Sequence, residues 1–166
     1  MDATAARRMA HETFVTDDNT YGCAETSYIV LKHAYGLADP DDSAPAMALN
    51  GGFAYQGGMC GALSGAALAV GQLASLQIPD HAVAKRVARG LVRAVMDDFV
   101  SKFGSTECRD LIGYQLHEPG EHDRFIESGV WRTECAAQVE FSVGRLAELA
   151  SPGVWDEAVA ELEGEG

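Results

Sequence analysis

Strand-forming patterns are nearly absent from this 166-residue sequence. No hairpin dipeptide separates two runs of alternating apolar and polar residues, the usual sign of a β-hairpin. Alanine, leucine, glutamate and arginine are frequent instead, and these residues favour helices. The sequence therefore predicts an all-α fold, a single compact helical domain of about six to eight helices over residues 1–166.

Basic residues are also scarce, with 12 Lys and Arg against 25 Asp and Glu and a formal net charge of −13. A surface of this sign repels nucleic acids and anionic membranes, so we expect neither as a partner. The one basic cluster consists of Lys85, Arg86, Arg89 and Arg93, on one face of an expected helix. We interpret it as a solvated face rather than a docking patch.

Long apolar runs and targeting segments are missing as well. The longest apolar stretch, about residues 66–78, is interrupted by polar residues and is too short to span a bilayer. No apolar segment follows the basic pair in residues 1–8, so secretion is not expected. We expect a cytoplasmic protein, in which cysteines serve metal binding or redox chemistry more often than structural disulfides.

Capping residues and apolar periodicity predict the helix boundaries. Asp80 is a good N-cap for a long helix over 81–103, in which apolar residues recur every four positions. Residues 114–130 are expected to be irregular. The other expected helices cover 3–15, 22–35, 45–51, 59–76, 106–111 and 133–150, and residues 151–166 are expected to form a C-terminal helix with an acidic tail.

Four cysteines, Cys23, Cys60, Cys108 and Cys135, are spread along the chain. None forms a CxxC pair, so neither a zinc ribbon nor a thioredoxin motif is present, and covalent c-type haem is excluded because no CxxCH occurs. Each cysteine lies in the predicted first turn of a helix, where free amides and the helix dipole stabilise a thiolate and lower its pKa. Four such thiolates would repel one another unless a cation or an iron–sulfur core lay between them.

Small residues recur every four positions beside Cys60, at Gly57, Gly61, Gly65 and Ala69. Such a stripe lets another helix, or an inorganic cluster, approach the main chain closely. The stripe and Cys60 are equally compatible with tight helix packing around a small buried hydrophobic residue. The shared setting of all four cysteines favours a function.

The segment Cys60-Gly61-Ala62-Leu63-Ser64-Gly65 reads CGAxxG, with one cysteine upstream and two lone cysteines downstream. Over residues 20–147 the chain thereby resembles the redox-active family named for its C…GCAxxG…C…C pattern. A similar domain in split-Soret cytochromes carries an iron–sulfur cluster. The resemblance implies that Cys23, Cys60, Cys108 and Cys135 bind a [2Fe–2S] or [4Fe–4S] cluster, although Gly22 replaces the Asn that often precedes the first cysteine.

Our leading hypothesis is an iron–sulfur protein that transfers electrons or senses redox state with an unidentified redox partner protein, its cluster near a surface or a homodimer contact. The alternatives are a thiol–disulfide enzyme that uses cysteine pairs and a structural zinc protein. Of the histidines, His117 and His122 could approach the site from the irregular segment. We expect the acids beside the cysteines to point outward, because negative charge destabilises a thiolate; these are Glu25, Glu107 and Glu134.

Overall fold

Helices make up the computed structural model, which describes residues 1–164. The α-helices are α1 (Ala3–Phe14), α2 (Cys23–Tyr35), α3 (Gly61–Gln77), α4 (His81–Phe103), α5 (Cys108–Ile112), α6 (Glu121–Ser128), α7 (Ala136–Leu146) and α8 (Val154–Gly164). Three tighter or wider helical segments join them, namely the 3₁₀ helices η1 (Ala44–Leu49) and η3 (Ala147–Ala150) and the π-helical turn η2 (Trp131–Cys135). Residues 1–164 contain no strand, so the all-α prediction is confirmed. The end of the predicted acidic tail, Glu165 and Gly166, lies outside the described residues.

The long helix α4 shows how the sequence sets its own boundaries. The Asp80 side chain accepts hydrogen bonds from the backbone N–H groups of Ala82 and Val83, at 2.9 and 3.0 Å, and so satisfies two free donors of the first turn. At the other end Gly104 takes a left-handed conformation, with φ of 87°. The predicted four-residue repeat faces the core, where Val87, Leu91, Val95 and Phe99 are buried.

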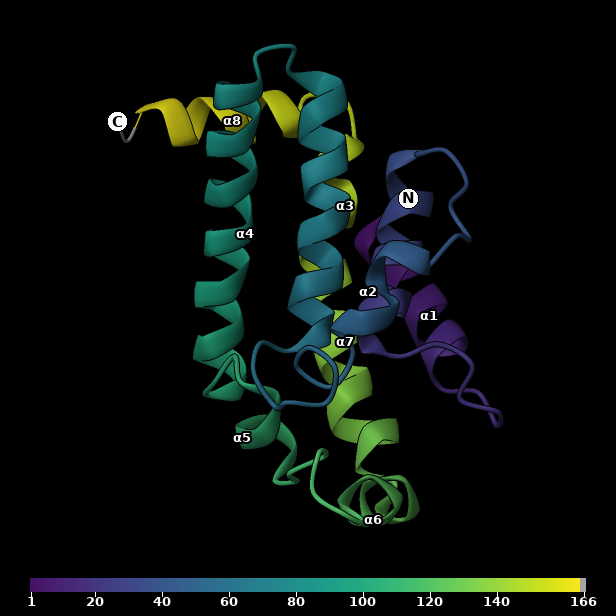
Figure 1. Cartoon of the computed structure of the whole chain (residues 1–166). Coiled ribbons are helices and arrows are strands. Elements are labelled where there is room, and N and C mark those ends of the chain that lie inside the picture. Colours follow the sequence, from purple (N-terminus) through teal and green to yellow (C-terminus); the bar gives the residue numbers. More distant parts are fainter. Residues whose placement is uncertain (165–166) are drawn as a thin grey trace.

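Helices α3 and α4 form an antiparallel pair, and α7 packs against α3 on the side away from the viewer in Figure 1. Helix α2 packs on α3, while α1 packs on α7. Helix α8 crosses the end of the molecule where α3 connects to α4 (Figure 1). The main core between these helices includes Tyr28, Leu31, Val70, Leu73, Phe99, Val139 and Val143.

A second, smaller hydrophobic cluster lies at the opposite end, around α5, α6 and η2 (Figure 1). Two cysteines, Cys108 and Cys135, belong to this cluster, and Cys23 packs against it. Cys60 belongs to the main core. The four cysteines therefore lie at the boundary between the two cores.

The structure corrects several predicted boundaries. Residues 114–130 are not wholly irregular, because α6 forms there between Gly120 and Gly129, which both have left-handed φ angles. The helix predicted over 133–150 begins earlier, with the π-helical turn at Trp131. The helices predicted from residues 59 and 106 begin at Gly61 and Cys108, since the residues before them pair with each other as extended chain.

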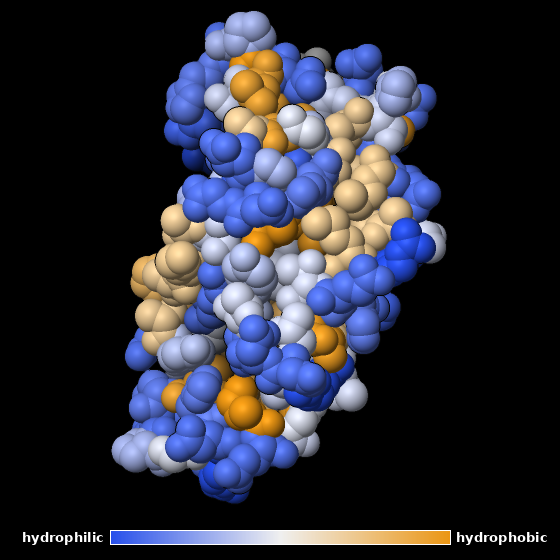
Figure 2. Space-filling view, turned by 90° about the vertical axis from the view of Figure 1, so that its right-hand side faces the viewer, coloured by the Kyte–Doolittle hydropathy of each residue, from blue (hydrophilic) through white to orange (hydrophobic). Residues whose placement is uncertain are grey.

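Hydrophilic residues cover most of the face in Figure 2, and the hydrophobic areas between them are small and separate. Among the helices of residues 1–164, none has the length and apolar character needed to cross a membrane.

Candidate functional site

The fold brings the four cysteines together from four separate segments. Cys23 is the first residue of α2, Cys60 is the N-cap of α3, Cys108 is the first residue of α5 and Cys135 ends the η2 turn. Each of the six thiol pairs is close enough for the charge of one thiolate to raise the pKa of the other. All four cysteines are free thiols. Their role as ligands stays a prediction.

Two of these segments are joined directly by backbone hydrogen bonds. Met59 and Glu107 form an isolated antiparallel bridge. The N–H of Cys60 donates to the carbonyl of Thr106 at 2.8 Å, and the N–H of Cys108 donates to the carbonyl of Gly58 at 2.7 Å. The bridge fixes the spacing between Cys60 and Cys108, although 48 positions separate them in the sequence (108 − 60).

The glycines of the CGAxxG segment make room for α2. A Cβ atom on Gly61 would lie 2.3 Å from the sulfur of Cys23, and a Cβ on Gly65 would lie 2.0 Å from the carbonyl oxygen of Ala24. Both distances are far inside van der Waals contact. The small-residue stripe therefore serves close packing of α2 on α3, and at Gly61 the space is filled by a cysteine sulfur.

Backbone and side-chain donors surround the sulfur of Cys23. Hydrogen bonds from the backbone of Gly51, Ala24, Cys23 and Gly61 act to lower the pKa of this thiol. The amide oxygen of Asn50 accepts from the N–H of Ala24 at 2.9 Å and lies 3.9 Å from the sulfur.

Asn50 is held in place by a buried carboxylate, Glu25. The Asn50 amide donates to Glu25 at 2.9 Å, and the N–H of Gly22 and the hydroxyl of Ser43 donate to the same carboxylate at 3.0 and 2.9 Å. The expectation that Glu25 points outward is therefore wrong: three donors satisfy it inside the protein, where it is 8% exposed. Glu134 is exposed, as predicted, and Glu107 pairs with Arg109 at the surface.

Gln138 of α7 is the side-chain partner of Cys60. Its amide oxygen lies 3.6 Å from the Cys60 sulfur, and both residues are 3% exposed. Backbone hydrogen bonds from Ala62 and Leu63 also act to lower the pKa of this thiol. Neither Gln138 nor Asn50 was predicted from the sequence. Gln138 carries no local signal, and Asn50 is marked only by the Gly51-Gly52 pair that follows it.

Cys135 does not lie at a free helix start, contrary to the prediction. The π-helical turn η2 runs directly into α7, so the chain is already helical before this residue. The N–H of the next residue, Ala136, is bonded to the carbonyls of Thr133 and Trp131. The wider turn places the Cys135 side chain in the smaller core, beside Cys108 and Trp131.

The pKa of every cysteine is raised, which corrects the expectation that helix starts lower it. Burial is the largest cause at all four residues, and neighbouring thiolates add to it at Cys60, Cys108 and Cys135. The pKa of Cys108 rises to about 12. Cys23 keeps some exposure as a residue, but its sulfur is enclosed and its pKa is raised as well. Without a bound cation the four thiols therefore stay protonated at neutral pH.

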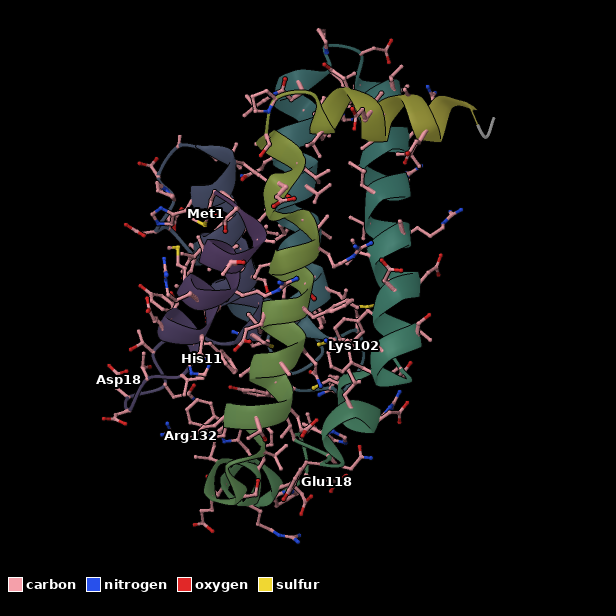
Figure 3. The ribbon with its side chains drawn as sticks, turned by 180° about the vertical axis from the view of Figure 1, so that it is seen from behind. Met1, His11, Asp18, Lys102, Glu118 and Arg132 are labelled. Atoms are coloured by element: carbon pink, nitrogen blue, oxygen red, sulfur yellow. The ribbon has the colours of Figure 1, made fainter. Side chains whose placement is uncertain are left out.

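A cavity of about 180 Å³ opens beside the sulfurs and is lined by Cys23, Cys108 and Cys135. His122 also lines it, and its ring packs at a tilted angle of 58° against Tyr55, with 5.0 Å between centroids. His117 pairs with Glu118 at the surface instead. Figure 3 shows the end of the molecule that holds this cavity, with Asp18, Arg132 and Glu118 labelled around it. The aromatic wall consists of Phe14, Phe125 and Trp131.

The four cysteines supply sulfur donors of the kind that metal centres bind. Among the side chains that the structure describes, no three from Cys, His, Asp or Glu are grouped as ligands of one metal ion. The thiols nevertheless interact in every pair, and backbone N–H groups surround two of the sulfurs. An iron–sulfur core suits such a set, because its irons take thiolates from several directions and N–H groups hydrogen-bond to the sulfurs.

A family model described as "Putative redox-active protein (C_GCAxxG_C_C)" matches residues 21–149. This range contains all four cysteines. No curated protein and no solved structure gives a significant match.

Proposed function

Because the chain belongs to the C_GCAxxG_C_C family of redox-active proteins, we propose that it holds an iron–sulfur cluster on Cys23, Cys60, Cys108 and Cys135. The cluster serves electron transfer or redox sensing. One geometric observation carries the proposal: Cys23, Cys108 and Cys135 line one cavity, and the bridge between Met59 and Glu107 holds the backbone of Cys60 beside that of Cys108.

The protein's own groups favour a cationic core among the sulfurs. Four buried thiols with raised pKa values resist ionisation, and a metal centre supplies the positive charge that lets all four lose their protons. Backbone N–H groups at Cys23 and Cys60 then stabilise the thiolates. When bound, an iron–sulfur cluster supplies reversible one-electron chemistry. The aromatic wall of the cavity limits the access of water.

The two alternatives receive less support from the site. A thiol–disulfide enzyme needs a thiolate of low pKa in an electropositive, partly exposed setting. Burial here raises the pKa of all four thiols. A structural zinc ion needs four ligands about 2.3 Å from one point. The described side chains are not grouped in that way.

Anaerobic purification followed by iron and acid-labile sulfide analysis tests the proposal. We expect brown protein that contains both elements. Cys60→Ser should lose most of the iron and sulfide, because a serine hydroxyl is a poor ligand for iron in such a cluster. Its helix content should stay close to that of the wild type, since the substitution changes one buried atom.

Met59→Ser is the matched control, because Met59 adjoins Cys60 but its side chain is 40% exposed. This variant should keep its iron. Colourless wild-type protein without sulfide, or normal iron content in Cys60→Ser, would contradict the proposal.

A further inference from the structure

Exposed apolar side chains are concentrated in one segment beside the cysteine site. Seven large hydrophobic residues are exposed in the described part of the chain, and four of them lie within residues 47–59, which we call the site loop. Phe53 is 62% exposed and Met47 60%. The other two are Tyr55 and Met59. Such a concentration at one functional end is typical of an interaction surface.

The backbone of the site loop is held in an unfavourable conformation. Residues 51–55 have successive φ values of 61°, 67°, 67°, 50° and 65°. Glycine tolerates this left-handed region, but Phe53, Ala54 and Tyr55 do not, at a cost of roughly 1–2 kcal/mol per residue. Strain of this kind persists where the surrounding structure enforces it, and it is concentrated at functional sites. Here the strained turn leaves the Phe53 ring in solvent.

The strained turn lies directly over the least buried of the four cysteines. The backbone of Gly51 hydrogen-bonds to the sulfur of Cys23. The Tyr55 ring packs on Gly51, where a Cβ atom would lie 2.3 Å from the ring, and its centroid lies 5.0 Å from that of the His122 ring. Gly51 therefore contacts both the exposed Tyr55 ring and the sulfur of a site cysteine.

Charge indicates what kind of surface fits this loop. Four acids around the same end are exposed, namely Asp17, Asp18, Glu118 and Asp123, and two of them are labelled in Figure 3. Three arginines lie at this end: Arg109 and Arg124 are paired with Glu107 and Glu121, and the Arg132 guanidinium lies over the Trp131 ring, 4.3 Å from its centroid. The basic cluster lies on the first half of α4, toward the opposite end in Figure 1. The whole chain carries −13 charges, so a second copy is repelled and a cation is attracted.

We propose that the site loop is the docking surface for a cationic electron-carrier protein, with Phe53 as an exposed apolar contact and this chain's acids at the same end of the molecule. The inference rests on the proposed function and adds the partner's chemistry to it. In each encounter one electron passes from the reduced site of this chain to the oxidised centre of the partner, and no bond or proton is transferred.

Stopped-flow oxidation of the reduced, iron-loaded protein tests the surface. The probes are a basic c-type cytochrome and, as a small oxidant that needs no docking, hexaammineruthenium(III). Phe53→Asn removes the ring and keeps a residue that tolerates left-handed backbone. Loss of a central aromatic contact should slow cytochrome reduction about five- to tenfold. The rate with the ruthenium complex should stay unchanged.

Leu76→Asn is the control, because Leu76 is 72% exposed at the far end of α3. It should leave both rates unchanged. With wild-type protein, added salt should slow the cytochrome reaction, since screening weakens attraction between opposite charges.

Equal cytochrome rates for wild type and Phe53→Asn, or a wild-type rate that rises with salt, would overturn the docking proposal. So would sedimentation data showing a wild-type dimer that Phe53→Asn converts to a monomer, because the loop would then bind a second copy. Absence of iron and sulfide would be detected before any kinetics and would remove the proposed function together with this inference. Failure of docking alone leaves the iron content normal.

Discussion

A single buried amide marks the inner side of the cysteine site. Gln138 contacts the Cys60 sulfur, and in the thiol form its oxygen accepts from the S–H. When the sulfur is ionised and bound to metal, the same side chain can only stabilise it by presenting its NH₂ group. Gln138 is then a positioning and tuning residue rather than a ligand.

Gln138→Leu should leave iron and sulfide content normal but lower the reduction potential. In the wild type an N–H···S hydrogen bond from Gln138 would stabilise the reduced state more than the oxidised state, because the reduced state carries more negative charge. The leucine variant cannot form this bond. If the reduced state loses about 1.4 kcal/mol more stabilisation than the oxidised state, the reduction potential falls by roughly 60 mV for one electron. We expect a decrease of that order. A redox titration measures the shift. An unchanged or higher potential would show that Gln138 has no such role.

At this scale the sequence points to the cysteines but not to the residues around them. Local capping signals predict helix starts at Cys23, Cys60, Cys108 and Cys135, which holds for the first three, and the role of all four as ligands stays a prediction. Gln138 and Asn50 reach the site from elements distant in sequence, so only tertiary packing reveals them. Glu25 was placed wrongly because its negative charge was expected to avoid the thiolates, whereas this acid closes a capping box with Gly22 and binds Asn50.

The packing of α2 on α3 is the element-level feature that sets the site. Gly65 lies one turn beyond Gly61 and faces the α2 backbone, so the two helices touch main chain to main chain. Cys23 begins α2 and Cys60 caps α3. Any separation of the helices therefore also separates two of the thiols.

Gly65→Ala should destabilise the protein by about 1–3 kcal/mol, the usual cost of overpacking a tight core. The added Cβ would lie 2.0 Å from the Ala24 carbonyl oxygen, which backbone movement alone can relieve. Urea unfolding of the cofactor-free protein measures the change.

Gly71→Ala is the matched control on the same helix. Nothing lies within 4 Å of a Cβ at Gly71, so alanine should stabilise α3 by up to about 1 kcal/mol through its higher helix propensity. Equal effects of the two substitutions would contradict the packing role of Gly65.

Long helices with strong periodicity were predicted well, the short helix α5 was predicted with shifted bounds, and α6 was not predicted. Asp80 and Gly104 bounded α4 correctly because their capping chemistry is local. Helix α6 was missed because it has eight residues and buries only Phe125. The π-helical turn before α7 was not predictable either, since the wider turn depends on packing around Trp131 and Cys135 rather than on a sequence signal.

For the whole molecule, the protonated thiols couple stability to pH. A group whose pKa is higher in the folded than in the unfolded state binds more protons when folded, so it stabilises the fold below the unfolded pKa. For Cys108 the pKa is about 12 in the folded protein, and its ordinary value, taken for the unfolded chain, is 9.0. Its contribution is complete below pH 9 and is lost as the pH rises toward 12. The other three thiols act in the same direction.

The cofactor-free protein should therefore lose stability between about pH 9 and 12 more steeply than Cys108→Ala does, because the variant lacks one of the titrating groups. Urea unfolding at a series of pH values gives the two slopes. Parallel slopes for the two proteins would mean that Cys108 is not held protonated by the fold.

Assembly in the cell follows from the scattered origin of the four thiols. The polypeptide leaves the ribosome from its N-terminus, so Cys23 and Cys60 emerge long before α7 can pack behind them. A nascent chain cannot complete the pocket until Cys135 and the helix after it are outside the exit tunnel. On the proposed function, delivery of iron and sulfide would therefore follow the emergence of α7, and a truncated product lacking α7 would have nothing packed behind Cys60 to retain them.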